Sequence, residues 1–394
     1  MTQNLALTWQ LTEIHGWGLV GVHTALHLIE QGRPPLLLEK PAMSTLRPEN
    51  RMALQSLEGG YQRVQALAAQ HPGKTILLQE FDVLHALGNG FTAGPPSERF
   101  RGRANVGVIA YEDTLFDAEV LARARSYDKL VVHSAYNRQL LADQGITNVG
   151  VALQGIDPSE IGPMPRTGRY GDRFVVFSGG KLEFRKAQDV VLTAFRIFQQ
   201  RHPEALLVTA WHNVWPALSQ SIAESPLTPV PPEVGGDGRL KIEEWALRYG
   251  VPEDAFVDLG FVGRGQIAPI LAECQAAVFP NRCEGATNLV AMEAMGCGVP
   301  VILSANTGHL DLIRPDAANP DNCWTLTRQT PMPNPKGNRT GWMESSVEEL
   351  VEKLEAIHRD RAEAKARADR ALAFIRGERT WSAFAAAFVA ACAV

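Results

Sequence analysis

The 394-residue chain is poor in features that define several large classes of protein. It has only five cysteines, an odd number with no Cys-x-x-Cys spacing, which predicts reduced and mostly buried thiols rather than disulfides or a zinc site. No apolar run reaches the roughly 20 residues that a transmembrane helix needs. The N-terminus lacks the basic start and apolar stretch of a signal peptide. These absences favour a cytoplasmic protein.

The chain also lacks an excess of positive charge. Its 38 Lys and Arg residues are outnumbered by 43 Asp and Glu, for a net charge of −5, which argues against a protein that binds nucleic acid through phosphate contacts. The apolar and charged fractions, 45% and 21%, are typical of a globular protein. A chain of this length exceeds one ordinary core and predicts two domains.

Strand-like and helical patterns alternate along the chain, which predicts parallel α/β layers. A second α/β unit begins near Phe174, and the preceding residues 157–172, rich in proline and glycine, have the composition of a linker. We therefore expect an N-terminal domain over residues 1–165 and a C-terminal domain over residues 170–377. Both are expected to be Rossmann-like.

Three glycines near the N-terminus satisfy the dinucleotide-binding pattern G-x-G-x-x-G. Gly16, Gly18 and Gly21 follow a predicted strand and begin a helix, and Glu39 ends the next strand where a ribose-binding acid would lie. Taken alone, this pattern indicates an NAD-dependent oxidoreductase. A tight strand-to-helix turn without any ligand needs glycine equally, because a side chain would obstruct close backbone approach.

The most informative stretch runs from Val278 to Ile302. An apolar strand end leads into a polar loop, a helix, and a Gly-Val-Pro turn into another apolar strand, and Glu284 and Glu293 bracket the loop and the first turns of the helix. A helix N-terminus with free backbone N–H groups binds anions, and a carboxylate further along can accept hydrogen bonds from sugar hydroxyls. The arrangement suits a nucleotide diphosphate ligand.

This stretch resembles the donor-binding signature of retaining glycosyltransferase family 4, whose members have the two-domain GT-B fold. Residues 284–285, 293–295 and 298–302 match it, but eight residues separate the two glutamates where the family usually has seven. The loop 286–288 must absorb the extra residue. The resemblance implies two Rossmann-like domains whose parallel sheets face a central cleft, with a C-terminal helix, about 378–394, crossing back to the first domain.

A basic motif at the start of the second domain extends the resemblance. The sequence Phe-Ser-Gly-Gly-Lys ends at Lys181, where the family usually has Arg, and Lys186 matches the family's Lys. Two cations at the carboxyl end of a strand can neutralise a leaving diphosphate. Lys186 is our first candidate for this role and Lys181 the second, while Arg185 is ambiguous.

The resemblance implies further contacts to the donor. Glu112 stands where many relatives carry a His that contacts the transferred sugar, and it is either a hydroxyl-binding residue or an ordinary surface Glu. His309 is expected to be structural. The catalytic residues that the resemblance implies are Lys181, Lys186, Glu284 and Glu112. The donor-binding residues that it implies are Gly16, Gly18, Gly180, Phe261, Val262, Thr287, Asn288, Leu289 and Glu293.

The implied function is retaining transfer of a hexose-type sugar from a nucleotide diphosphate donor to a glycan, lipid-linked or protein acceptor, as in polysaccharide biosynthesis. No further cofactor is expected, and the absence of Asp-x-Asp weakens the case for a metal-bridged diphosphate. Two alternatives stay open: the NAD-dependent oxidoreductase, and a catalytically inactive nucleotide-sugar-binding protein, which the unusual spacing and Glu112 favour. Peripheral contact with the inner face of the membrane also stays open, and the sequence does not determine the nucleotide base, sugar, acceptor or oligomeric state.

Overall fold

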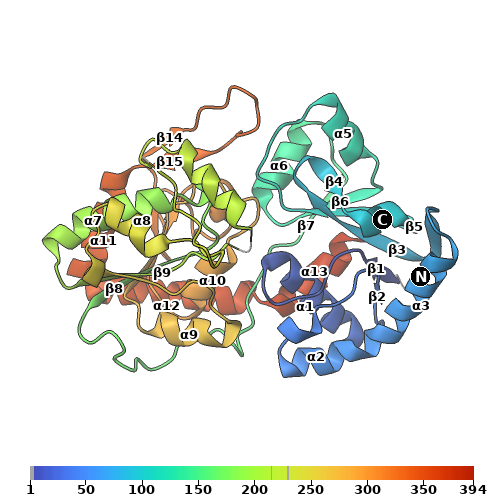
Figure 1. The fold of residues 1–394 in the computed structure, drawn as a ribbon, viewed down its shortest axis with the longest axis horizontal. Helices are drawn as coiled ribbons and strands as arrows, with labels where there is room; N and C mark the ends of the chain where they lie inside the picture. Colours follow the sequence, from blue (N-terminus) through green and yellow to red (C-terminus); the bar gives the residue numbers. More distant parts are fainter. Residues whose placement is uncertain (1–3, 214, 229) are drawn as a thin grey trace. The chain divides into compact units, whose positions relative to one another are not determined.

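The computed structural model describes residues 4–213, 215–228 and 230–394. Its chain divides into two compact units (Figure 1). Unit 1 comprises Met1–Gly155, Asn334–Thr340 and Arg379–Val394, and unit 2 comprises Ile156–Pro333 and Gly341–Glu378. The expected linker over residues 157–172 is therefore counted with unit 2, and Ile156 and Ile161 are buried in its core.

Unit 1 is built on a seven-stranded sheet. Six strands follow the order β2-β1-β3-β5-β6-β7, and the seventh, β4, pairs with β3 outside this order. All pairings along this order are parallel, while β4 is antiparallel to β3. The strands are β1 (Leu5–Leu7), β2 (Leu36–Leu37), β3 (Ile76–Gly88), β4 (Thr92–Ala93), β5 (Phe100–Ile109), β6 (Lys129–Val132) and β7 (Val149–Val151).

The helices of unit 1 include one from the far end of the chain. They are α1 (Gly16–Glu30), α2 (Pro48–Leu54), α3 (Glu58–Gln70), α4 (Pro95–Arg99), α5 (Ala118–Arg125), α6 (Ala135–Asp143) and α13 (Trp381–Ala391). In α13 the ring of Trp381 stacks on His23 of α1 with 4.7 Å between centroids, and Phe384 and Phe388 pack on His133. The predicted return of the C-terminal helix to the first domain is confirmed.

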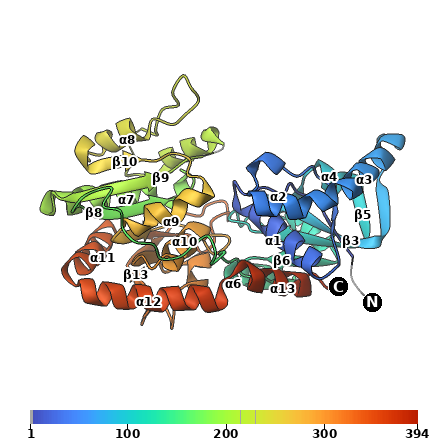
Figure 2. The ribbon, with the colours of Figure 1, turned by 90° about the horizontal axis from the view of Figure 1, so that it is seen from below.

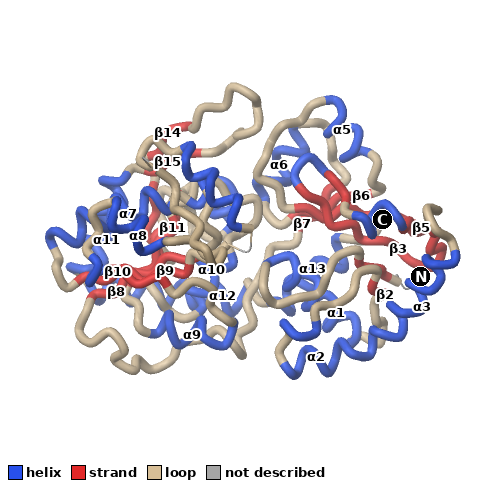
Figure 3. Tube along the Cα trace, in the orientation of Figure 1, coloured by secondary structure: helices blue, strands red, loops and turns tan. Residues whose placement is uncertain are grey.

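Unit 2 is built on a six-stranded parallel sheet with the order β10-β9-β8-β11-β12-β13, drawn in red in Figure 3. Its strands are β8 (Phe174–Gly179), β9 (Ala205–Ala210), β10 (Phe256–Asp258), β11 (Ala276–Phe279), β12 (Val301–Ser304) and β13 (Trp324–Leu326). A separate antiparallel hairpin pairs β14 (Gln329–Pro331) with β15 (Met343–Ser345).

Helices cover both faces of this sheet (Figure 2). They are α7 (Gln188–Arg201), α8 (Ile242–Arg248), α9 (Arg264–Ala272), α10 (Leu289–Gly296), α11 (Val347–Arg359) and α12 (Arg361–Glu378). Successive residues of a strand point to opposite faces, so on β8 Phe174 and Val176 join the core under α7, α8 and α11, whereas Val175 and Phe177 join the core under α9, α10 and α12. Burial on both faces explains why these strands are continuously apolar.

Two further features bear on the sequence predictions. All five cysteines are free and buried, as predicted. Among the described residues, we find no helix with the length and apolar character needed to cross a membrane.

The strand order determines where candidate residues can meet. Parallel strands present their carboxyl ends at one edge of the sheet, and ligands of α/β proteins bind outside that edge. In unit 2, β8, β11 and β12 are adjacent, so the loops that follow them emerge side by side. These loops carry Lys186, Glu284 and His309.

Candidate active site

The loop after β8 carries the candidate cations. A short 3-10 helix, η4 (Phe184–Lys186), is followed by Ala187 in the left-handed conformation, with φ of 57°, which turns the chain into α7. Gly180 has φ of 119°, a conformation that side chains rarely adopt. A Cβ there would lie 3.9 Å from Cε of Lys186, so this glycine borders the candidate lysine directly.

Glu284, in the loop after β11, is the centre of a buried polar cluster. Its carboxylate accepts a short ion-paired hydrogen bond from Nζ of Lys186, one of 3.1 Å from Arg185, and a short one from the amide of Asn281. Its backbone N–H donates to Oγ1 of Thr307 at 2.9 Å. The side chains of Glu284 and Lys186 are only 5% and 10% exposed. The structure thus brings two of the predicted catalytic residues together.

The electrostatics of this cluster favour an ionised carboxylate. Burial alone would raise the pKa of Glu284, but the charges of Lys186 and Arg185 outweigh it and hold that pKa at about 2. Burial lowers the pKa of Lys186, and Glu284 offsets only part of the effect. Arg185 also pairs with Glu183 at 2.7 Å, so the cluster contains two cations and two carboxylates.

Glu284 is therefore expected to stabilise the fold in a pH-dependent way. Its folded pKa, about 2, lies below the ordinary 4.5, so on acidification the unfolded chain takes up the proton first. The stabilisation is fully present above about pH 4.5 and is lost as the pH falls towards about 2. Urea unfolding of the native chain and of Glu284→Gln, between pH 7 and pH 3, should show a difference in unfolding free energy that shrinks with acid. The exposed Glu253→Gln is the control, and a pH-independent difference would contradict this assignment.

Arg282 stabilises the loop that carries Glu284. Its guanidinium is fully buried, contacts Asp189 at 2.6 and 3.0 Å and Glu344 at 3.0 Å, and lies 4.2 Å from the ring centre of Phe184. Its backbone N–H donates to the carbonyl of Arg185 at 2.8 Å. One arginine thereby ties the loop of Glu284 to η4, to α7 and to β15. Arg282 could not be identified from the sequence, where its only signal is a cation three residues after an apolar strand.

The start of α10 is fixed by a buried network. Asn288 caps the helix in a left-handed conformation with φ of 65°, accepts from the N–H of Ala291, and donates through Nδ2 to Nε2 of His309 at 3.0 Å. The hydroxyl of Ser304 donates to the backbone carbonyl of Asn281. Its oxygen is therefore free to accept, and Nδ1–H of His309 donates to it at 2.9 Å. Burial lowers the pKa of His309 to about 4, which keeps the ring neutral. This geometry agrees with the structural role expected for His309.

The loop between Glu284 and α10 passes extremely close to the loop after β12. A Cβ built on Gly308 would lie 1.6 Å from the carbonyl oxygen of Ala286, and the N–H of Gly308 donates to the carbonyl of Glu284 at 3.0 Å. Thr287 in this loop is fully buried. Only glycine at position 308 allows the extra residue of the loop to take this path.

Glu293 belongs to a different cluster. It lies on α10, is 5% exposed, and accepts a hydrogen bond of 3.0 Å from Arg264, which also pairs with Glu160 at 3.1 Å. Burial raises the pKa of Glu293, and Arg264 compensates only in part. Glu293 is therefore not a solvent-facing helix residue. Arg264 and Glu160 could not be identified from the sequence, because nothing in their local sequences indicates that they form an ion pair.

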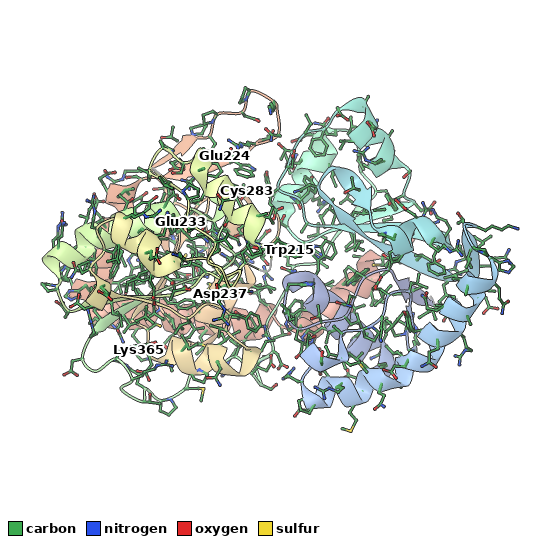
Figure 4. The ribbon with its side chains drawn as sticks, viewed as in Figure 1. Trp215, Glu224, Glu233, Asp237, Cys283 and Lys365 are labelled. Carbon is green, nitrogen blue, oxygen red and sulfur yellow. The ribbon has the colours of Figure 1, made fainter. Side chains whose placement is uncertain are left out.

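The remaining donor-side candidates lie in unit 2 without joining either cluster through a described bond. Nζ of Lys181 lies 5.0 Å from the ring centre of Trp215, which Figure 4 labels. Phe261 is 54% exposed and its ring contacts His212 at 5.4 Å, with Val262 beside it half-buried. Leu289 is the first residue of α10.

The N-terminal glycines of unit 1 have a packing explanation. A Cβ on Gly18 would lie 2.1 Å from the carbonyl oxygen of Thr12, and one on Gly21 would lie 2.5 Å from Leu11. Gly16 begins α1, but β1 ends at Leu7, so residues 8–15 replace the tight strand-to-helix turn of a dinucleotide site. This geometry disfavours the NAD interpretation.

Glu112 follows β5 in unit 1 and is half-buried. Its backbone N–H donates to Oδ1 of Asn89 at 3.1 Å, and Asn89 itself follows β3. The residue therefore lies at the carboxyl edge of the sheet of unit 1, the edge at which ligands of parallel sheets bind.

Comparison with known proteins finds similarity to glycosyltransferases over part of the chain. Residues 164–322 match the family model of glycosyl transferases group 1, and residues 263–388 match that of family 4 glycosyltransferases in conflict systems. An uncharacterized glycosyltransferase of Bacillus subtilis, YqgM, is 28% identical over 187 residues, which cover 47% of this chain and 44% of that protein. The chain thus matches less than half the length of this curated relative.

Solved structures share the whole fold. HepE from Anabaena, in complex with UDP and glucose, matches with a TM-score of 0.67 at 16% identity and 99% coverage of both chains. Sucrose-phosphate synthase from Thermosynechococcus elongatus matches with a TM-score of 0.66 at 14% identity, covering 99% of this chain and 98% of that one.

These neighbours share the two-domain GT-B architecture, which confirms the predicted fold. In sequence, residues 164–388 are similar to the group 1 and family 4 glycosyltransferases, in agreement with the resemblance seen in the sequence analysis.

Proposed function

We propose that the protein transfers a hexose-type sugar from a nucleoside diphosphate donor to a glycan acceptor, with retention of anomeric configuration. The observation that carries the proposal is the buried cluster in which Lys186 and Arg185 share the carboxylate of Glu284 beside the capped start of α10. Two further observations support the donor class: HepE was solved with UDP and glucose, and TarM of S. aureus with UDP and α-GlcNAc-glycerol.

Lys186 and Arg185 supply the charge that the leaving group needs. As the bond from the anomeric carbon to the diphosphate breaks, negative charge grows on the phosphate oxygen, and cations already held in a buried site stabilise it without reorganisation. Glu284 holds both cations in position, and its low pKa keeps it a hydrogen-bond acceptor for the sugar hydroxyls. Lys181 is a secondary cation for the same diphosphate.

Retention follows, in this proposal, without an enzyme nucleophile. The acceptor oxygen bonds to the anomeric carbon on the face that the diphosphate leaves, and the acceptor's proton passes to the leaving phosphate oxygen. Glu284 is held by Lys186, Arg185 and Asn281, an environment suited to orienting a sugar rather than to attacking it. A retaining hydrolase instead needs two carboxylates about 5–5.5 Å apart that flank the bond.

The cluster of Glu293, Arg264 and Glu160 is the proposed site for the nucleoside half of the donor. We propose that Glu293 accepts hydrogen bonds from the ribose hydroxyls and that the N-terminal turn of α10, with Thr287, Asn288 and Leu289, receives the diphosphate. The positive charge of Arg264 favours the ionised form of Glu293 and opposes the rise in its pKa that burial causes. The exposed loop of Phe261 and Val262 then holds the base.

The donor identity can be tested with a thermal-shift panel. UDP, GDP, ADP, their common sugar conjugates and NAD(H) are added to the native chain, to Lys186→Ala and to Glu293→Ala. A ligand at a hundred times its dissociation constant adds about 2.7 kcal/mol to stability. We expect one nucleoside diphosphate to raise Tm and both variants to lose most of that shift. A shift with NAD alone, unchanged in the variants, would refute the proposal.

The same donor then tests turnover. Sugar release or transfer, followed by NMR of the anomeric proton of the product, distinguishes an enzyme from an inactive nucleotide-sugar-binding protein. An α-linked product from an α-linked donor is expected. Binding without hydrolysis or transfer to any glycan acceptor would favour the inactive protein, and an inverted product would refute retention.

A further inference from the structure

A second cluster of ionisable side chains lies at the opposite edge of the sheet of unit 2 from the candidate active site. His202 and Glu204 lie in the turn between α7 and the amino end of β9, and Glu355 and His358 lie three residues apart on α11. The carbonyl of Glu204 accepts from the N–H of Phe174, the first residue of β8, which fixes the cluster beside the amino ends of the strands.

Three of these side chains place possible ligand atoms close to one another. Oε1 of Glu204 lies 3.0 Å from Nε2 of His358 and 3.6 Å from Nδ1 of His202, and one ligand atom from each residue lies within 4.8 Å of the others. Ligand bonds of roughly 2.0–2.2 Å in a tetrahedral zinc site put neighbouring donor atoms roughly 3.3–3.6 Å apart. The two separations from Oε1 of Glu204, 3.0 and 3.6 Å, lie close to this range.

A fourth residue orients one of the imidazoles. Nε2 of His202 lies 2.8 Å from Oε2 of Glu355, and the other oxygen of Glu355 accepts from Arg201 at 3.2 Å. When Nε2–H donates to Glu355, the lone pair of Nδ1 is left facing Glu204. Metal-binding histidines almost always donate their second ring N–H to such a carboxylate, which fixes the tautomer and makes the ligand nitrogen more basic.

The cluster also has rigid support and an open side. The ring of His202 packs on Phe198 of α7 at 4.5 Å, and the ring of His358 packs on Phe174 at 4.9 Å. The side chains of His202, Glu204 and His358 are 19%, 47% and 30% exposed, so an ion can reach them from solvent. Ligands on packed elements with solvent access meet the ordinary requirements of a metal site.

We propose that His202, Glu204 and His358 bind a divalent transition-metal ion, zinc foremost, with water completing the coordination. Two imidazoles and one carboxylate form a donor set that zinc commonly uses. The ion would join the end of α7 to α11 at the edge of the sheet remote from sugar transfer, and would therefore stabilise unit 2 rather than take part in catalysis.

The test uses the full chain, stripped with a chelator and titrated with ZnCl2 by calorimetry and with CoCl2 by visible absorption. We expect one saturable equivalent and the d–d bands of nitrogen- and oxygen-coordinated cobalt, with an increase in Tm on zinc addition. His202→Ala and His358→Ala should abolish all three responses. Glu355→Gln should weaken binding by about 10–100-fold, the usual cost of losing an orienting partner.

The exposed histidine His71, in unit 1, gives the matched control, because His71→Ala should leave binding unchanged. The metal-free Tm of each variant shows whether it folds, and His358→Gln is the second variant should the alanine unfold. Absence of saturable binding, or equal binding by native chain and folded histidine variants, would overturn the proposal and leave the cluster as an ion-pair network.

Discussion

Replacement of Lys186 by alanine is expected to lower kcat by about 10²–10³-fold, equivalent to about 2.7–4 kcal/mol of barrier, as for loss of a preorganised donor to developing charge. Lys186 is 10% exposed and hydrogen-bonded to Glu284, so its ammonium is already positioned before the donor arrives. The effect should appear in kcat, since charge on the diphosphate develops during bond cleavage. Steady-state kinetics with the donor identified by thermal shift would measure it.

The controls for Lys186→Ala must separate chemistry from folding. Lys365 lies on the surface of α12, is 75% exposed and pairs with Asp369 four residues on, so Lys365→Ala should keep full activity (Figure 4). Lys186→Arg should recover part of kcat, because a cation returns to the site with different geometry. If Lys186→Ala folds normally, binds the donor and turns over at the native rate, the assignment of this lysine is wrong.

The largest loss of stability is expected from Arg282→Met. Removing one partner of a buried ion pair typically costs about 3–5 kcal/mol, because the other charge stays buried without compensation. Here the carboxylate of Asp189 is fully buried, and its two bonds from Arg282 would both be lost. Urea denaturation should therefore show a large fall in the midpoint with little change in the slope.

A double variant makes this prediction more specific. Arg282→Met with Asp189→Leu removes both charges, and we expect it to be more stable than Arg282→Met alone, because an uncharged pair carries no desolvation penalty. Arg328→Met is the surface control. Arg328 pairs with Glu352 at 2.7 Å, but both side chains are more than half exposed, so stability should change little. A single variant as stable as the native chain would show that Arg282 is not essential to the loop.

The sequence predicted the parts of this molecule that depend on local pattern. Alternating strand and helix signals correctly indicated parallel sheets in two units. The return of the C-terminal helix to unit 1 was implied by the family resemblance, not by the local pattern. Lys186 and Glu284 were each identified from a local motif, but neither motif indicated that the two residues form a hydrogen bond. That contact depends on β8 and β11 being neighbours, which is a property of the topology.

Long-range partners and close packing could not be predicted in this way. Arg282 and Arg264 find their carboxylates through the tertiary fold, at positions that no local spacing marks. The glycine pattern at Gly18 and Gly21 arises from the approach of residues 9–12, not from a dinucleotide. Composition also misled us at residues 157–172, where proline and glycine do not prevent the chain from contributing Ile161 to a core.

The division of the chain into two units determines how chimeras of proteins with this fold should be designed. Its two units are not consecutive: the polypeptide changes unit after residues 155, 333, 340 and 378. Residues 334–340, which belong to unit 1, are hydrogen-bonded to Thr114. Its hydroxyl donates to the carbonyl of Gly337 and accepts from the N–H of Thr340. A chimera that exchanges unit 2 between two proteins of this fold by a single crossover would therefore carry residues 334–340 and α13 from the wrong parent. A hybrid that retains both segments with the first half is the one expected to fold.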